Sequence, residues 1–178
     1  MNKSYSYDND GKWKSGFNVK AKKGHTEPTN EIVRTIMESY IIPETGEVIK
    51  LSPHQIRILN HAFTEVMLDG EKEKRLPYRT VLYSCPKKSG KTELAGAITY
   101  AWSRVYGGEM LSIANDKDQA KERMFSRVEK MLSWVQQHDP ERYKHEVAQQ
   151  DADYIEFKNP QAQFKAIPCD PYGEAGGH

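Results

Sequence analysis

The chain has 178 residues, a length that suits one ordinary domain and is short for two. Its 26 Lys and Arg residues almost balance its 25 Asp and Glu residues, and the net charge of +1 excludes the global basic footprint of a free-standing nucleic-acid binder, although it permits a local basic patch. No apolar run approaches the roughly 18 residues of a membrane-spanning helix, and the chain does not begin with the apolar core of a signal peptide. The composition therefore predicts a soluble, intracellular protein without a membrane partner.

The cysteines and histidines follow no pattern that is typical of a metal site or a disulfide framework. Cys85 and Cys169 are 84 positions apart and belong to no CxxC or Cys/His spacing. Two pairs of histidines are spaced seven residues apart, but two nitrogen ligands without a third partner make a poor metal site. We expect no metal site that side chains alone would form.

Residues 1–28 are predicted to form a flexible basic arm, because they carry six lysines and three acidic residues and show no hydrophobic periodicity. Two interpretations stay open, a solvated tail and an arm that contacts DNA phosphates, and we favour the solvated tail. The remaining residues, 29–178, are predicted to form one domain.

The first part of this domain is predicted to contain helices and a hairpin. Apolar residues recur at helical spacing at Ile32, Val33, Ile36, Met37 and Tyr40. A turn over 43–46 then separates the apolar pairs 41–42 and 48–49, which is typical of a hairpin. Ser52 is predicted to cap a second helix, with Pro53 first and Gln55 third. This helix is expected to end at 69–70, with an apolar stripe of Ile56, Leu59, Phe63, Val66 and Met67.

From residue 80 the pattern changes to alternating strands and helices. Residues 80–84 are rich in β-branched and aromatic side chains and predict a strand. After a loop, a helix is predicted from about Thr92 to the glycines at 107–108, followed by a strand at 110–114.

A long helix capped by Asp116 is expected next, with Gln119 in the capping-box position. Its inward-facing residues are predicted to be Ala120, Met124, Val128, Met131, Leu132 and Val135. Asp139 and Pro140 are predicted to begin a shorter helix that extends to about Gln150. Segments 154–157 and 163–167 then predict a hairpin.

The segment 85–92, with the sequence CPKKSGKT, lies between the predicted strand and helix. It matches the phosphate-binding pattern GxxxxGK[ST] at Gly90, Lys91 and Thr92, whereas Cys85 replaces the first glycine. A polyphosphate needs several backbone N–H groups that point inward, and the N-terminus of the following helix adds a favourable dipole. Gly90 would let the backbone approach closely, Lys91 would place a charge at the β and γ phosphates, and the Thr92 hydroxyl would ligate Mg²⁺.

The predicted ATP site also includes other loop residues and Gln55. Pro86, Lys88 and Ser89 complete the loop, although Lys88 also fits a solvated neighbour of the site. Gln55 would recognise adenine, because a side-chain amide pairs with the N6 and N7 atoms of that base. The alternative is structural, since Gln55 also occupies the position of a capping-box glutamine. The residues alone do not decide between these two roles.

The order of these motifs resembles the N-terminal ATPase region of phage terminase large subunits. The segment LSPHQ at 51–55 precedes a helix, and CPKKSGKT begins 30 residues after Gln55. The next strand and helix, with SIA at 112–114 and DQA at 118–120, fit the same pattern, as do the hairpin and the Gly-rich segment 173–177. The resemblance extends from about Thr29 to the last residue, and the order and spacing of the motifs carry it.

The resemblance implies an α/β P-loop NTPase of the ASCE or RecA-like class, with a mostly parallel sheet and flanking helices. It implies a motor that uses ATP and Mg²⁺ to translocate viral double-stranded DNA into a procapsid. The expected partners are this DNA, a small terminase subunit and the portal protein. The full-length protein would form an oligomeric ring in the host cytoplasm and, transiently, at the procapsid portal.

The resemblance also implies roles for two further residues. Gln55 would be the adenine reader. Lys87 occupies a position where many terminases carry an arginine that acts on the γ-phosphate, so its implied catalytic role is in the transition state. A lysine supplies charge but lacks the planar fork of a guanidinium.

Two parts of such a motor do not occur in the sequence. No hydrophobic strand ending in Asp-Glu, the Walker B motif, follows the loop; residues 66–69 mimic it but precede the loop and are predicted to be helical. The nuclease domain of the family is also missing, so we interpret the chain as an N-terminal fragment with a fold that is incomplete at its C-terminus. We expect very slow ATP hydrolysis without the Walker B carboxylates, and association or marginal stability because of unpaired strand edges.

Three other functions stay open. A phosphotransferase such as a nucleotide kinase would share the strand, loop and helix but would need an Arg-rich lid, and residues 140–178 offer only Arg142. A module that binds a nucleotide without turnover would agree with the missing acidic motif. A helicase would need further motifs, which the chain lacks.

Overall fold

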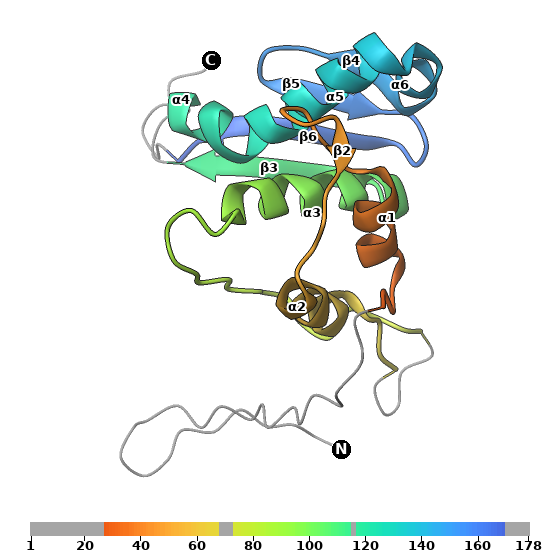
Figure 1. Ribbon diagram of the computed structural model, residues 1–178, viewed down its shortest axis with the longest axis vertical. Coiled ribbons are helices and arrows are strands. Elements are labelled where there is room, and N and C mark those ends of the chain that lie inside the picture. Colours follow the sequence, from red (N-terminus) through yellow and green to blue (C-terminus); the bar gives the residue numbers. More distant parts are fainter. Residues whose placement is uncertain (1–26, 68–72, 115–116, 170–178) are drawn as a thin grey trace, which may run out of the picture.

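The structure is a computed structural model that describes residues 27–67, 73–114 and 117–169. Almost all of the predicted basic arm, the Gly-rich segment 173–177 and the predicted cap Asp116 lie outside these residues. The described chain has a sheet and a layer of helices, and α3 lies between the sheet and α2 (Figure 1). None of the helices in these ranges combines the length and the hydropathy that a membrane-spanning helix needs.

Local signals define the elements of the first part of the chain. These are α1 (Glu31–Ser39), β1 (Ile41–Ile42), β2 (Glu47–Val48) and α2 (Pro53–Phe63). The predicted capping box is present at α2, where Ser52 Oγ accepts from the Gln55 N–H and Gln55 Oε1 accepts from the Ser52 N–H at 2.8 Å. The predicted hairpin is also confirmed, since β1 and β2 pair in antiparallel fashion.

α2 ends six residues before the predicted end at 69. The backbone of Thr64 is extended, and Val66 exchanges two backbone hydrogen bonds with Arg75 in an isolated antiparallel bridge. Met67 is 53% exposed. The prediction that Val66 and Met67 continue the helical stripe is therefore wrong, because Val66 pairs with Arg75 in extended conformation and Met67 is exposed.

The rest of the chain forms a sheet of four strands and the helices that pack on it. The elements are α3 (Lys91–Val105), β3 (Gly108–Ala114), α4 (Lys117–Ala120), η1 (Lys121–Phe125), α5 (Ser126–His138), α6 (Pro140–Glu146), β4 (Val147–Gln150), β5 (Tyr154–Phe157) and β6 (Ala162–Pro168). The strand order is β3-β6-β5-β4, with β3 parallel to β6 and the other two pairs antiparallel. The fold is thus α/β, but the expectation of a mostly parallel sheet is wrong, since the short β4–β5 and β5–β6 connections permit only antiparallel pairing.

Residues 80–84 do not form the predicted strand. Their backbone is irregular, and Val81 and Leu82 are 50% and 93% exposed. A strand needs a neighbour for its backbone N–H and C=O groups, and no strand of the described sheet pairs with this segment. The segment is therefore rich in β-branched and aromatic residues but forms no backbone pairing with the described sheet.

The predicted long helix is interrupted by a kink in η1 (Lys121–Phe125), where Arg123 has non-helical φ and ψ angles. The Ser126 N–H donates to the carbonyl of Lys121, five residues back. Phe125, which was not predicted to face inward, is fully buried, and Met124, which was, is partly buried against the core. The remaining predicted inward positions are buried: Ala120, Val128, Met131, Leu132 and Val135.

The following helix is shorter than predicted. α6 ends at Glu146, and residues 147–150, which were expected to be helical, pair with β5 as strand β4. The predicted hairpin of the segments 154–157 and 163–167 is confirmed as β5 and β6.

Helices cover one face of the sheet. Phe125 of η1 packs on Phe164 of β6 with ring centroids 5.1 Å apart, and Tyr100 of α3 meets Phe157 of β5 at 6.4 Å. Beside this core, the buried carboxylate of Glu146 accepts a hydrogen bond from the Tyr100 hydroxyl at 2.8 Å and from Arg142 Nε at 3.1 Å. Because both oxygens of this buried charge are paired, the network fixes α6 against α3.

Candidate nucleotide-binding loop

The segment 85–92 forms a loop that enters α3 at the end of the sheet where β3 terminates (Figure 1). Ligands of α/β folds commonly bind beyond the carboxyl ends of parallel strands, and β3 and β6 are such a pair. The loop predicted from the sequence therefore lies where the topology of the sheet favours a site.

Two residues of the loop backbone have positive φ angles. Lys88 and Gly90 have φ angles of +65° and +75°, and Lys88 is the only non-glycine residue with a positive φ among the described residues. Successive backbone N–H groups in such an arrangement point into a common concavity that binds anions. A lysine in this region of φ and ψ is strained, and strain of this kind is concentrated at functional sites.

Ser89 closes the loop on itself. Its Oγ donates to the Pro86 carbonyl at 2.8 Å and lies 2.9 Å from Cys85 Sγ. Cys85 thus occupies the position of the first glycine in the motif and supplies a side-chain partner that glycine lacks. The closed loop holds its backbone N–H groups in place before any ligand arrives.

The first turn of α3 presents free backbone donors. Gly90 is the N-cap residue, and within the described chain no side chain caps this helix, whereas Asn30, Ser52 and Asp139 cap α1, α2 and α6. A Cβ placed on Gly90 would meet nothing within 4 Å, so the approach to these N–H groups is open. Uncapped N–H groups and the positive end of a helix dipole favour an anionic ligand.

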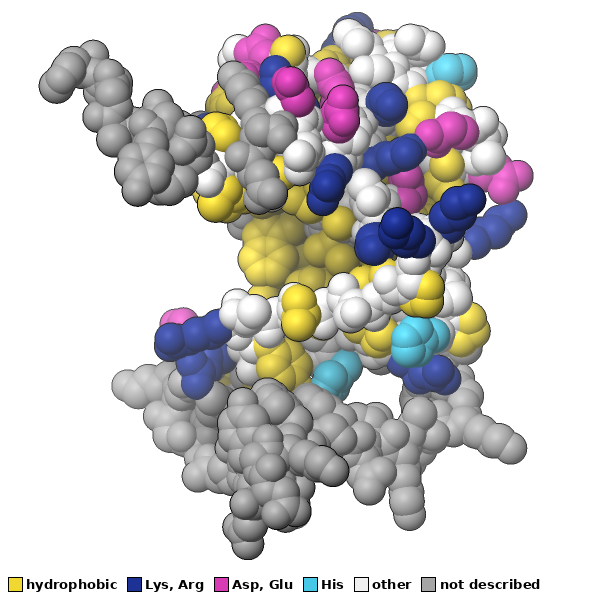
Figure 2. Space-filling model, turned by 90° about the vertical axis from the view of Figure 1, so that its left-hand side faces the viewer, with side chains coloured by type: hydrophobic (Ala, Val, Ile, Leu, Met, Phe, Trp, Pro, Cys, Tyr) yellow, Lys and Arg dark blue, Asp and Glu magenta, His cyan; other side chains and the backbone are white. Residues whose placement is uncertain are grey.

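The loop adds positive charge to these donors. Lys87, Lys88 and Lys91 are exposed, and Thr92 is half-buried. On the face of the molecule that contains the loop, Figure 2 shows several Lys and Arg side chains grouped across the middle. The predicted site residues from Pro86 to Thr92 therefore lie together, in the loop before α3 and in the first turn of this helix.

A network of polar and charged side chains anchors the beginning of α3. The Tyr40 hydroxyl donates to Glu93 Oε1 at 2.9 Å, and Arg127 Nη1 lies 3.3 Å from Glu93 Oε2 and 2.7 Å from Glu44 Oε1. Burial, and then the charge of Glu93, raise the pKa of Tyr40, whereas a backbone hydrogen bond and Arg127 lower the pKa of Glu44. α1, α5 and the β1–β2 turn thus fix the helix that carries the loop.

Close packing at Gly96 is part of this anchor. A Cβ at Gly96 would lie 2.9 Å from Arg127 Cβ and 3.0 Å from the Tyr40 hydroxyl. The absence of a side chain lets α5 and α1 approach α3 one turn after Glu93. Sequence reasoning missed Tyr40, Glu93 and Arg127 in this role, and only the position of Glu93 directly after Thr92 could have drawn attention to it.

Gln55 lies apart from the loop, on the first turn of α2. Its side-chain oxygen already accepts the Ser52 N–H, so the structure shows the capping role of this residue. A role in reading adenine would require the side chain to use its remaining donors or to leave the cap.

The residues present fit the phosphates of a nucleotide better than they fit a metal ion by themselves. Among the described residues no group of three His, Cys, Asp or Glu side chains is placed to hold a metal. Mg²⁺ is often held by one or two protein ligands together with phosphate oxygens and water, and Thr92 is the hydroxyl ligand that the loop offers. Comparison of the chain with protein-family models, with curated proteins and with solved structures finds no match.

Proposed function

We propose that the loop 85–92 binds the phosphates of Mg·ATP and that the chain is the N-terminal ATPase portion of a viral DNA-packaging motor, similar to a terminase large subunit. The observation that carries the nucleotide site is the loop backbone, in which Lys88 and Gly90 adopt left-handed conformations directly before the uncapped N-terminus of α3. This geometry concentrates backbone donors on one point, as phosphate binding requires.

Each part of the loop has a distinct task in this proposal. The N–H groups of the loop and of the first turn of α3 surround the β-phosphate, and Lys91 adds a point charge between the β and γ phosphates. Thr92 ligates Mg²⁺, which neutralises the charge of the phosphate oxygens when bound. Lys87, exposed on the loop, supplies charge at the γ-phosphate.

The assignment to a packaging motor is supported by the order of the motifs, from LSPHQ at 51–55 through the loop to the strand and helix that follow it. In this proposal a P-loop fold of the ASCE class, viral double-stranded DNA, a small terminase subunit and a portal protein are the expected context. Gln55 then recognises adenine with its amide, at the expense of one capping hydrogen bond.

Binding of a non-hydrolysable imido analogue of ATP, with Mg²⁺, tests the nucleotide site by calorimetry. We expect the wild-type chain to bind it, Lys91→Ala to bind at least tenfold more weakly, and an imido analogue of GTP to bind more weakly than the ATP analogue. Lys50→Ala is the control, because Lys50 is an exposed lysine next to the capping box of α2 and pairs with Glu47. A folded wild-type chain that binds neither analogue, or equal binding by Lys91→Ala, would contradict the proposal.

A further inference from the structure

A kink in η1 places an arginine on the surface at the same end of the molecule as the loop. Arg123 lies at this kink and has φ and ψ of −90° and −105°, which lie outside the helical region. Residues held in unusual regions of φ and ψ are concentrated at functional sites. Nothing in the nucleotide site described above accounts for this kink.

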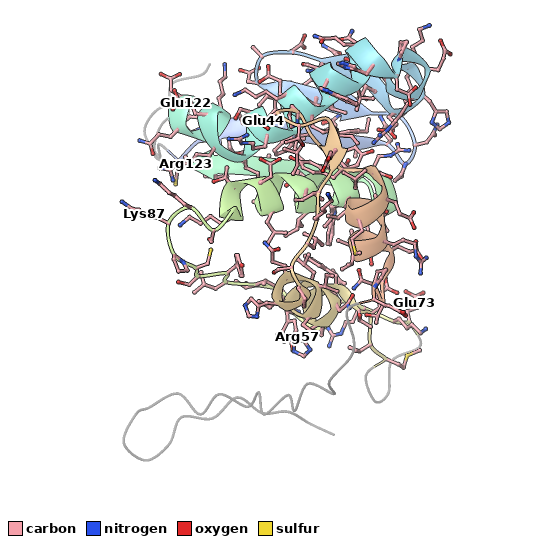
Figure 3. The ribbon with its side chains drawn as sticks, in the orientation of Figure 1. Glu44, Arg57, Glu73, Lys87, Glu122 and Arg123 are labelled. Atoms are coloured by element: carbon pink, nitrogen blue, oxygen red, sulfur yellow. The ribbon has the colours of Figure 1, made fainter. Side chains whose placement is uncertain are left out.

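The two residues that follow Arg123 pack inward, whereas the Arg123 side chain points outward (Figure 3). Met124 turns toward α3, where its Sδ lies 3.3 Å from Thr99 Oγ1, and Phe125 is fully buried against the sheet. Arg123 itself is exposed, and its side chain forms no hydrogen bond or ion pair with any residue in the described ranges. An exposed arginine that lies at a kink and has no partner among the described residues is available to a ligand.

The position of Arg123 suits the far end of a polyphosphate. In Figure 3, Arg123 on η1 and Lys87 on the loop lie on the same side of the molecule, beyond the end of β3. η1 packs on α3, whose first turn receives the phosphates in the proposed function, through the contact of Met124 with Thr99. A guanidinium binds a phosphate with two parallel hydrogen bonds, which the lysines of the loop cannot do.

We propose that Arg123 contacts the terminal phosphate of a nucleoside triphosphate held by the loop 85–92. This inference rests on the proposed nucleotide site and adds a residue that distinguishes a triphosphate from a diphosphate. The backbone N–H groups of the loop hold the phosphates that both nucleotides share, whereas Arg123 contacts only the phosphate that ADP lacks. The distorted turn keeps the guanidinium in place for this contact.

The test compares the affinities of two ligands, Mg·ADP and the imido analogue of ATP with Mg²⁺, for four forms of the full chain. These are wild type, Arg123→Ala, Arg123→Lys and Arg57→Ala. Arg57 is the matched control, because it is an exposed arginine on α2 (Figure 3). We expect Arg123→Ala to weaken binding of the triphosphate analogue about tenfold and to leave ADP affinity within twofold. Arg123→Lys should recover part of the loss.

The outcomes separate this inference from the proposed function. If wild type binds both ligands and Arg123→Ala lowers both affinities equally or neither, the role of Arg123 is wrong and the nucleotide site stands. If the folded wild-type chain binds neither ligand, the proposed site fails and this inference fails with it. Thermal melts of all four forms establish that they are folded, and Arg123→Lys, which keeps the charge and the stem, decides the matter if the alanine variant is unstable.

Discussion

Gly90 adopts a φ of +75° immediately before α3, in a place where an added Cβ would meet no atom within 4 Å. A side chain there would be penalised by the backbone conformation alone, since L-residues in the left-handed region are less stable by roughly 1–2 kcal/mol. We therefore expect Gly90→Ala to lower the free energy of unfolding by about 1 kcal/mol. Urea unfolding measures this loss, and Lys87→Ala serves as the control in the same loop. Equal stability of Gly90→Ala and wild type would argue against the loop conformation described here.

At the scale of single residues, the sequence predicts the position of residues that belong to a local motif. The place of Gly90, Lys91 and Thr92 at the start of a helix could be predicted from the sequence motif, and their role in phosphate binding stays a prediction. The position of Arg123 could not be predicted, because it lies at a kink in η1, next to residues that pack on distant parts of the chain, such as Phe125 on Phe164 almost 40 positions later. Contacts of this range leave no periodic signal in the sequence.

At the scale of elements, two buried tyrosines connect helices and are expected to make the free energy of unfolding decrease as the pH rises above 10. Tyr40 at the end of α1 donates to Glu93 of α3, and Tyr100 of α3 donates to Glu146 of α6. Burial first, and the neighbouring carboxylate second, raise the pKa of both hydroxyls far above the value of 10 expected in the unfolded chain. Their contribution is fully present below pH 10 and is lost as pH rises, because only the unfolded chain releases these protons.

Each tyrosine should steepen the loss of stability above pH 10 by about 1.4 kcal/mol per pH unit. Tyr40→Phe and Tyr100→Phe are each expected to remove one such contribution from the slope, whatever they do to stability at neutral pH. Urea unfolding at pH 8.5, 10 and 11 measures the slopes. Parallel curves for wild type and either variant would show that its hydroxyl ionises in the folded state as it does in the unfolded chain.

The elements themselves were predictable where their signals are local. The helical spacing of apolar residues was sufficient for α1, the capping residues for the beginning of α2, and a short turn for the β1–β2 hairpin. Residues 80–84 and 147–150 show the limit of such signals. Residues 80–84 have a strand-like composition but form no strand, because no described strand pairs with them. Residues 147–150 were predicted to continue a helix but form β4, which pairs with β5. Pairing between distant segments decides both cases.

At the scale of the whole molecule, the outer edge of β3 has no strand beside it among the described residues, because β3 begins the order β3-β6-β5-β4. Two apolar side chains next to this edge are exposed, Leu111 by 41% and Ile113 by 56%. An unpaired edge with exposed apolar residues accepts strands from other chains. We therefore expect the isolated chain to associate at micromolar concentrations.

Ile113→Lys should suppress this association, since a charge beside the edge must be desolvated when another strand pairs with it. The expected result is that about tenfold more protein is needed for the same associated fraction, in sedimentation velocity over a concentration series. Met67→Lys is the matched control, because Met67 is exposed to a similar extent, 53%, and lies outside the sheet. If both variants associate as wild type does, the edge of β3 is not the contact. If Met67→Lys alone abolishes association, the contact lies beside the bridge of Val66 and Arg75 rather than on the sheet.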